Sequence, residues 1–133
     1  GGEAGSVSSI NYVKNGIAGM LENVPREKLI GGVPFYTRLW TEAGDGTITS
    51  KAMGIAEEKR WVDNNQVELT WQADTAQYYG EVQTSDGAQF LWMEEERSLK
   101  EKMNVIRQND LAGVACWKLG FEDSAAWDSI QWN

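Results

Sequence analysis

The fold is decided by the apolar run Leu29-Ile30-Gly31-Gly32-Val33-Pro34-Phe35, in which apolar residues do not alternate with polar ones. A second run of the same kind, Ala112-Gly113-Val114-Ala115-Cys116-Trp117, lies near the other end of the chain. Strands that are apolar on both faces are typical of parallel sheets covered by helices. Because two such strands cannot cover their own faces, the pattern predicts a piece of a larger α/β fold.

Helical patterns precede both apolar runs. Residues 9–23 place apolar side chains on one face at helical spacing, with Ser8 or Ser9 as the cap. Before the second run, Ser98 and Glu101 match a capping box in front of an apolar helical stripe. A further short helix is expected after the second run.

The middle of the chain has a different pattern. Residues 50–64 predict a helix, and residues 67–71 alternate between apolar and polar as a half-buried strand does. Residues 77–83 and 88–93 predict two more strands, joined by a hairpin turn at Ser85-Asp86-Gly87. A small α+β module with antiparallel strands is therefore expected between the two α/β pieces.

The composition limits the class of partner. The chain has 133 residues, which is the size of one domain, and a net charge of −8. Because this charge repels polyanions, nucleic acid and anionic membrane surfaces are poor partners, whereas a neutral polysaccharide is compatible. No apolar run approaches the roughly 20 residues that a bilayer requires.

The residue types also limit the chemistry. There is no histidine and one cysteine, Cys116, so His-based triads and zinc sites of imidazole or paired thiolates are excluded within the chain. We therefore expect neither a metal nor a cofactor. Cys116 lies in an apolar strand, where cysteine behaves as a small hydrophobe. Seven tryptophans are many for one small core, so some are expected to line a groove, while Trp61 and Trp71 are expected inside the module.

Three ordered motifs give the chain a resemblance to the family 18 glycoside hydrolases. Residues 28–38 resemble the K-[LI]-x-x-G-[VI]-P-F-Y-G-R strand of that family. Residues 92–99 and 112–122 are similar to late segments of its bacterial members, which include chitinases and spore-associated or cell-wall-lytic enzymes. Thr37 stands where the family usually has Gly, which favours the cell-wall branch.

The resemblance implies an α/β fold that is the C-terminal part of a TIM (β/α)8 barrel, namely its last two βα units with an inserted α+β module. Residues 1–40 would hold a barrel helix and strand, residues 41–95 the inserted module, and residues 96–133 the last barrel helix, strand and terminal helix. The N-terminal barrel half is then the expected partner. Because its strand edges are open, the isolated chain is expected to form a homo-oligomer.

The family's catalytic signature, D-x-x-D-x-D-x-E, does not occur in the sequence, and we expect it upstream of Gly1. Most glycosidases use two carboxylates, but in this family the substrate's own N-acetyl group attacks the anomeric carbon and one glutamic acid protonates the leaving group. Glu94-Glu95-Glu96 is interpreted as a solvated run that favours the start of the next helix. No catalytic residue is therefore assigned to this chain.

Substrate-binding residues are expected after the two buried strands and in the module. By the resemblance, Trp117 forms the aromatic floor beneath a sugar; the alternative is a core tryptophan. Tyr36 and Arg38 follow the first strand, where α/β folds place ligand contacts, and the alternative for them is a cation–π or barrel-lining pair. Glu122 follows the second strand, where it could also belong to the start of a helix. The full set of candidates is Trp117, Tyr36, Arg38, Trp40, Trp92 and Glu122.

These observations predict part of a glycoside hydrolase that acts on β-1,4-linked N-acetylglucosamine polymers, either peptidoglycan or chitin. The chain would supply substrate-binding walls without the acid, would be inactive alone, and would belong to an extracellular protein of the cell wall or spore. One alternative is a non-catalytic carbohydrate-binding module or an inactive family member, which loss of the upstream signature would favour. Another is a protein–protein interaction domain that binds no sugar.

Overall fold

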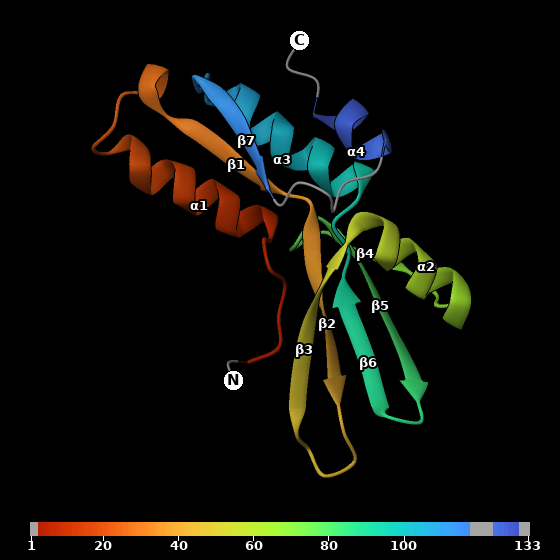
Figure 1. Ribbon diagram of the computed structural model, residues 1–133. Coiled ribbons are helices and arrows are strands. Elements are labelled where there is room, and N and C mark those ends of the chain that lie inside the picture. Colours follow the sequence, from red (N-terminus) through yellow and green to blue (C-terminus); the bar gives the residue numbers. More distant parts are fainter. Residues whose placement is uncertain (1–2, 118–123, 131–133) are drawn as a thin grey trace.

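The computed structural model describes residues 3–117 and 124–130, which form two sheets and four α-helices (Figure 1). The first sheet pairs β1 with β7, and the second has the strand order β3-β2-β6-β5-β4. No helix in the described ranges is long and apolar enough to cross a membrane. The elements are α1 (Ile10–Leu21), the short 3-10 helix η1 (Arg26–Lys28), β1 (Ile30–Pro34), β2 (Tyr36–Glu42), β3 (Ile48–Gly54), α2 (Ile55–Asn65), β4 (Thr70–Gln72), β5 (Gln77–Thr84), β6 (Gly87–Trp92), α3 (Glu96–Gln108), β7 (Gly113–Trp117) and α4 (Ser124–Ser129).

The two apolar runs form the first sheet. β1 and β7 are parallel, with Ile30 opposite Gly113 and Pro34 opposite Trp117, so the predicted parallel pairing is confirmed. Helices α1 and α3 lie beside this sheet (Figure 1), and its core joins Val33 of β1 to apolar side chains of both helices. The predicted mixed α/β fold class is thus confirmed.

Helix α3 packs closely against β1 at Gly31. A Cβ atom at this position would lie 2.7 Å from both Cδ1 and Cγ1 of Ile106. Ile106 is completely buried and has little room to withdraw, because protein cores are close-packed. A side chain at residue 31 would therefore push α3 away from the sheet.

The N-terminal helix starts where its sequence predicts. Ser9 is the N-cap of α1, and its hydroxyl accepts a hydrogen bond from the backbone N–H of Tyr12 at 3.1 Å. Ile10, Val13 and Ile17 form the buried stripe of the helix. The amphipathic pattern of residues 9–23 is confirmed.

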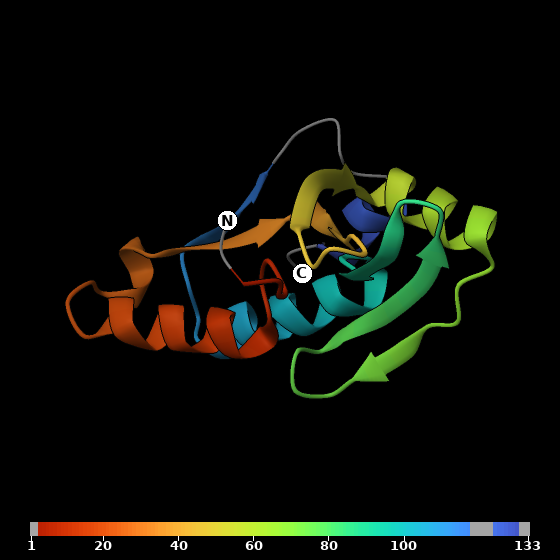
Figure 2. The same cartoon turned by 90° about the horizontal axis from the view of Figure 1, so that it is seen from below.

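The chain changes from the first sheet to the second at Phe35. This residue alone separates β1 from β2, and its completely buried ring meets Trp127 edge-on with centroids 5.1 Å apart. The second sheet is antiparallel throughout and extends away from the first (Figures 1 and 2). Because this sheet already includes Tyr36, the predicted module boundary after residue 40 lies inside β2; the division into modules remains a proposal.

The helix predicted over residues 50–64 is wrong in its first part. Residues 48–54 form β3, which pairs with β2 along its whole length, and α2 begins only at Ile55. Ala52, Ile55 and Ala56 fit helical spacing, but the turn around Gly46 returns the chain beside β2. The ladder of hydrogen bonds to β2 then outweighs a weak local preference.

Two other local predictions need adjustment. The cap of α3 is Glu95, whose carboxylate accepts hydrogen bonds from the backbone N–H groups of Arg97 and Ser98 at 3.0 and 3.1 Å. Ser98 thus lies inside the helix as the second member of this box, and Glu101 has no part in it. The strand predicted over residues 67–71 is reduced to the three residues of β4. The hairpin between β5 and β6 is confirmed.

A second core lies between α2 and one face of the five-stranded sheet. Trp61 of α2 is 7% exposed, and its indole N–H donates to Oε1 of Gln89 at 3.0 Å, so Trp61 is buried as expected. This core occupies only the side of the sheet that faces α2, so the side chains on the opposite side of the sheet do not belong to it. Its buried members are Leu39, Met53, Trp61, Val67, Leu91 and Met93.

Candidate functional site

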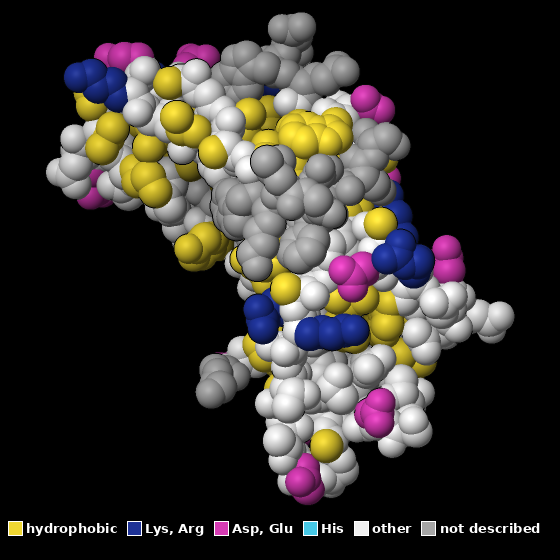
Figure 3. Space-filling view, viewed as in Figure 1, with side chains coloured by type: hydrophobic (Ala, Val, Ile, Leu, Met, Phe, Trp, Pro, Cys, Tyr) yellow, Lys and Arg dark blue, Asp and Glu magenta, His cyan; other side chains and the backbone are white. Residues whose placement is uncertain are grey.

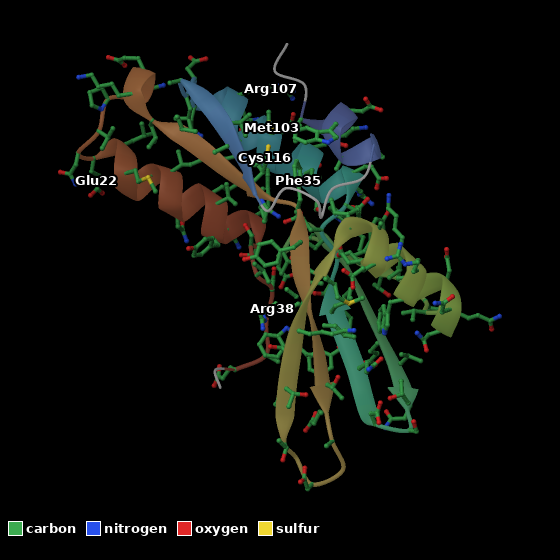
Figure 4. The ribbon with its side chains drawn as sticks, in the orientation of Figure 1. Glu22, Phe35, Arg38, Met103, Arg107 and Cys116 are labelled. Atoms are coloured by element: carbon green, nitrogen blue, oxygen red, sulfur yellow. The ribbon has the colours of Figure 1, made fainter. Side chains whose placement is uncertain are left out.

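Four of the predicted substrate-binding residues lie on the sheet face away from α2. In β2, Thr37 and Leu39 are 2% and 4% exposed, and Leu39 packs into the core beneath α2. Since side chains alternate along a strand, Tyr36, Arg38 and Trp40 point to the opposite face. Figure 4 shows Arg38 on the side of the sheet away from α2.

The neighbouring strands extend this face. Trp40 of β2 is paired with Phe90 of β6, and Tyr79 of β5 is paired with Trp92 of β6. Residues opposite each other in a ladder share a face, so these four aromatic rings lie together. We call the surface made by Tyr36, Arg38, Trp40, Tyr79, Phe90 and Trp92 the aromatic face.

Hydrogen bonds fix three of these side chains. Nε of Arg38 donates to the Ser50 hydroxyl at 3.0 Å. Nε1 of Trp92 donates to Oε1 of Gln72 at 3.0 Å, and Nε1 of Trp40 donates to the carbonyl of Gly5 at 3.1 Å. The polar edges of both indoles are therefore satisfied, and their orientation is set before any ligand arrives.

Two members of the aromatic face escaped the sequence analysis. The ring of Tyr79 lies 5.1 Å from that of Trp92, and the ring of Phe90 lies 6.1 Å from it. The Tyr79 hydroxyl donates to Glu81 at 3.0 Å, and burial together with this bond raises the pKa of Tyr79 to about 12. The alternation of β5 and β6 on either side of the predicted hairpin could have identified both residues.

The N-terminal segment meets the aromatic face. Besides the bond from Trp40 to Gly5, the hydroxyl of Ser6 donates to Oε1 of Gln77. Gln77 is only 1% exposed at the start of β5. The segment thus bridges the outgoing strand β2 and the strand β5, and it borders the face.

Tyr36 also borders a cavity of about 360 Å³ between α1 and β1. The lining is mainly apolar and includes Tyr12, Met20 and Ile30, which are 71%, 53% and 58% exposed. Figure 3 shows hydrophobic side chains reaching the surface over this part of the molecule, at the upper left. This cavity lies along the outer edge of β1, which is paired only with β7 among the described strands.

The acidic run Glu94-Glu95-Glu96 is not solvated as predicted, because Glu94 and Glu95 are 1% and 8% exposed. The Lys102 ammonium, itself 1% exposed, donates to Glu94, and so does the Ser98 hydroxyl. Glu95 caps α3. Only Glu96 remains partly exposed, in an ion pair with Lys59 at 2.5 Å. Glu94 and Glu95 therefore belong to a buried connection between β6 and α3, which we call the acidic joint, and the accessible carboxylate of the run, Glu96, is paired with Lys59.

A third buried carboxyl completes this joint. Glu58 of α2 is completely buried, and its Oε1 accepts the backbone N–H of Glu94 at 2.7 Å, while its Oε2 has no hydrogen-bond partner. Burial raises the pKa of Glu58 well above its ordinary range, and burial also raises that of Glu94 against the opposing effect of Lys102. Burial thus disfavours the charged form of both groups, and the Lys102 ammonium partly offsets this for Glu94.

The remaining predicted site residues lie at or beyond the end of β7. The backbone of Trp117 pairs with Pro34. Glu122 lies outside the described residues. Cys116 is half-buried in β7, where burial raises the pKa of its thiol, as its interpretation as a small hydrophobe requires. Trp71 is half-buried beneath the guanidinium of Arg97, which lies 3.7 Å from its ring centroid.

No group of three or more Cys, Asp or Glu side chains within residues 3–117 and 124–130 is arranged to hold a metal ion. The chemistry that the aromatic face offers is recognition. Flat aromatic rings with satisfied polar edges suit the C–H faces of sugars, and the Arg38 guanidinium suits their hydroxyl and acyl oxygens.

Comparison with known sequences gives relatives among bacterial glycosylases. The chain is 26% identical over 129 residues to a cortical fragment-lytic enzyme of Bacillus subtilis, which covers 96% of this chain and 30% of the relative. It is 26% identical over 131 residues to the uncharacterized glycosylase YvbX of the same organism, covering 98% and 38% respectively. The chain therefore spans about a third of these curated relatives.

Comparison with solved structures gives the same fold. A chitinase from Chromobacterium violaceum superposes with a TM-score of 0.88 at 21% identity, over 98% of this chain and 40% of that one. The spore cortex-lytic enzyme SleL of Bacillus megaterium superposes with a TM-score of 0.86 at 24% identity, over 97% and 30%. The sequence profile of Glycosyl hydrolases family 18 matches residues 5–122, which is most of the chain, and the chain belongs to this family.

Proposed function

We propose that this chain forms one wall of the glycan-binding groove of a family 18 glycoside hydrolase. Its substrates would be β-1,4-linked polymers containing N-acetylglucosamine, either peptidoglycan or chitin. The observation that carries the proposal is the gathering of Tyr36, Arg38, Trp40 and Trp92 on one sheet face, where hydrogen bonds already hold the side chains of Arg38, Trp40 and Trp92. Such a face binds a sugar without first reorganising, so less of the binding energy is lost to ordering side chains.

The relatives support a cell-wall glycan as substrate. Two of them are described as a cortical fragment-lytic enzyme and a spore cortex-lytic enzyme, and a third as a chitinase. By this analogy the protein acts outside the cell, at the wall or in the spore. β1 and β7 would then be the last two strands of a TIM barrel, and the five-stranded sheet with α2 its inserted module.

The residues present suggest which part of the reaction this chain would serve. The sequence contains no D-x-x-D-x-D-x-E, and the described glutamates that are buried, Glu58, Glu94 and Glu95, serve the joint beside α3. The chain would thus bind substrate, with Trp117 as the sugar floor and Glu122 beside it, while the general acid would come from the rest of the enzyme. A protein that binds glycan without cleaving it would use the same face.

The test is a titration of the chain with N-acetylglucosamine oligosaccharides, followed by tryptophan fluorescence. Trp117→Ala and Trp92→Ala should each lose most of the saccharide-induced quenching, because stacked aromatic anchors dominate such interfaces. Trp127→Phe is the matched control: this tryptophan is 43% exposed on α4, away from the aromatic face, and phenylalanine preserves its contact with Phe35.

The folded state of each variant is checked by circular dichroism. The proposal is wrong if wild-type chain shows no saccharide-dependent change in fluorescence or in its NMR spectrum. Quenching that survives in Trp117→Ala but not in Trp92→Ala would remove Trp117 from the site and leave the aromatic face in place.

A further inference from the structure

We propose that the acidic joint is a proton-dependent latch, meaning a contact that holds the two sheets together while Glu58 carries a proton and opens locally when that proton is lost. The opening would occur without unfolding of the chain. This inference goes beyond the proposed function and does not depend on it. It rests on the position of Glu58 in the fold and on the charges that are buried beside it.

Glu58 lies between the two cores of the molecule. The buried residues of α2 are Ile55, Glu58 and Trp61, whose spacing of three places them on one side of the helix. Ile55 belongs to the core of the parallel sheet, and Trp61 belongs to the core beneath the five-stranded sheet. Glu58 is therefore the polar residue of the buried stripe, at the point where the two sheets meet.

Glu58 connects α2 to the chain that leads from β6 into α3. Its Oε1 accepts the backbone N–H of Glu94 at 2.7 Å, while its Oε2 has no hydrogen-bond partner among the described residues. A second polar contact between α2 and the start of α3 is the ion pair of Lys59 with Glu96, which is partly exposed. Because exposed pairs contribute little to stability, the buried bond of Glu58 is the stronger part of this connection.

The buried charges of the joint do not balance if every carboxyl is ionised. Three buried carboxyls, those of Glu58, Glu94 and Glu95, accompany one buried ammonium, that of Lys102. Glu94 accepts from Lys102 and from Ser98, and Glu95 accepts two backbone N–H groups at the start of α3, so both environments favour a carboxylate. Glu58 has one neutral donor. It is the carboxyl that holds a proton, because a buried charge without a counter-charge is far more costly than an unpaired hydroxyl.

The groups around Glu58 set the direction of the pH dependence. Burial raises the pKa of Glu58 well above its ordinary range; the N–H of Glu94 and the charge of Lys59 oppose this, and the negative charges of Glu94 and Glu95 add to it. The strands β2 and β3, which also pack against α2, carry three charged residues that are not buried: Arg38, Glu42 and Lys51. Loss of the proton therefore places a negative charge beside two others, which weakens the contact.

The size of the effect follows from proton linkage. The pKa of Glu58 is higher in the closed latch than in the open one, where the carboxyl is solvated. The closed latch is therefore most favoured at low pH, and its advantage is lost as pH rises towards the pKa of the closed form. Above the ordinary value of about 4.3, each unit of pH should favour opening by up to about tenfold until the closed form itself ionises.

The test is hydrogen exchange of backbone amides, followed by NMR between about pH 5 and about pH 8 and corrected for the intrinsic rate at each pH. Protection of the Glu94 amide should fall by up to about tenfold per unit of pH. The amides of Met93 and Leu99 are the matched controls, because they donate to the carbonyls of Tyr78 and Glu95 at 2.7 and 2.9 Å on either side of Glu94. Both should exchange more slowly than Glu94 at every pH.

Two variants assign the proton. Glu58→Gln keeps the shape of the side chain and cannot ionise, so protection of the Glu94 amide should no longer depend on pH. Glu96→Gln removes a partly exposed carboxylate of the same region and should keep the pH dependence of wild type. If Glu58→Gln does not fold, the carbon-13 resonance of the Glu58 carboxyl in wild type replaces it, and this resonance should titrate at higher pH than that of Glu96.

Three results would overturn the latch. Equal exchange of the Glu94 and Met93 amides at every pH would mean that the proton acts on the whole fold. A pH dependence that survives in Glu58→Gln would place the proton on another group. A Glu58 carboxyl that titrates no higher than that of Glu96 would mean that the joint holds no proton there.

Discussion

Replacing Lys102 by Met should leave the Glu94 carboxylate buried without a counter-charge. Both side chains of this ion pair are 1% exposed, and the Ser98 hydroxyl would be the side-chain donor that remains to Glu94. Removing one partner of a buried pair costs about 3–5 kcal/mol of folding free energy. A typical domain is stabilised by only about 5–15 kcal/mol, so the loss should be large on that scale.

The cost should depend on pH, because Glu94 can respond by taking up a proton. Burial raises its pKa and Lys102 lowers it, so the substitution should raise the pKa further. A carboxyl whose pKa is higher in the folded state than in the unfolded state favours folding below the unfolded value, and this contribution is lost as pH rises through the folded value. The penalty of Lys102→Met should therefore be full at neutral pH and should shrink as pH falls towards about 4.3, the ordinary pKa of glutamate.

The assay is urea unfolding followed by tryptophan fluorescence at about pH 7.5 and about pH 5, two values between which the penalty should already fall. The double variant Glu94→Gln/Lys102→Met removes both charges and should recover much of the loss. Lys59→Met is the matched control, since its pair with Glu96 is 36% and 33% exposed and should contribute less than about 1 kcal/mol. The reasoning is refuted if Lys102→Met costs no more than Lys59→Met, or if its cost does not change with pH.

Glu58→Gln should stabilise the chain at about pH 8 and have little effect at about pH 4. The pKa of Glu58 is raised in the folded state, so the carboxyl group favours folding only at low pH and this contribution is lost as pH rises; urea unfolding midpoints at the two pH values measure the difference. The isolated chain should associate through the apolar edge of β1, and Ile30→Lys, which places a charge at a 58% exposed position of that edge, should make it monomeric. Light scattering measures the mass of both, and a monomeric wild-type chain at high concentration would contradict the expectation. The pure chain should release no reducing ends from N-acetylglucosamine oligosaccharides, since the proposed function places the general acid outside it and such a group contributes about 100- to 10,000-fold to rate. Measured turnover would require a catalytic residue within the chain.

The first sheet could be predicted because the sequence patterns that indicate its strands and helices are local. The runs that became β1 and β7 are continuously apolar, and Ser9 stands directly before an amphipathic stripe. β3 could not be predicted, since apolar residues at helical spacing do not show that a strand ending at Glu42 is ready to pair with the segment that follows it. Pairing with β2 is a tertiary event, and tertiary context decides strand formation more than local preference does.

The acidic joint was missed for a related reason. A run of three glutamates is solvated in most chains, and nothing within the run shows that it is buried. The available signal was Lys102, which lies on the apolar stripe of α3 with Leu99, Met103 and Ile106, all of which are buried. A lysine at such a position requires a buried partner, because an unpaired charge there is too costly.

The sequence analysis identified Tyr36, Arg38, Trp40 and Trp92 of the aromatic face and missed Tyr79 and Phe90. Tyr36, Arg38 and Trp40 alternate along one strand, so their common face follows from strand geometry once β2 is recognised. Phe90 and Tyr79 depend on the register of the β5–β6 hairpin and on its pairing with β2, which no local pattern supplies.

The buried charges and the aromatic face are connected by the two points at which the chain crosses between the sheets. At the outgoing point the Thr37 hydroxyl donates to the carbonyl of Trp92 at 2.6 Å, and at the returning point Glu58 accepts from the N–H of Glu94. Apolar contacts alone would let one sheet slide or pivot against the other, whereas hydrogen bonds lose strength quickly as their geometry changes. The joint therefore holds the aromatic face at a fixed angle to the parallel strands. A groove built from both sheets needs this, because an error of about 1 Å in the position of a binding group is enough to impair function.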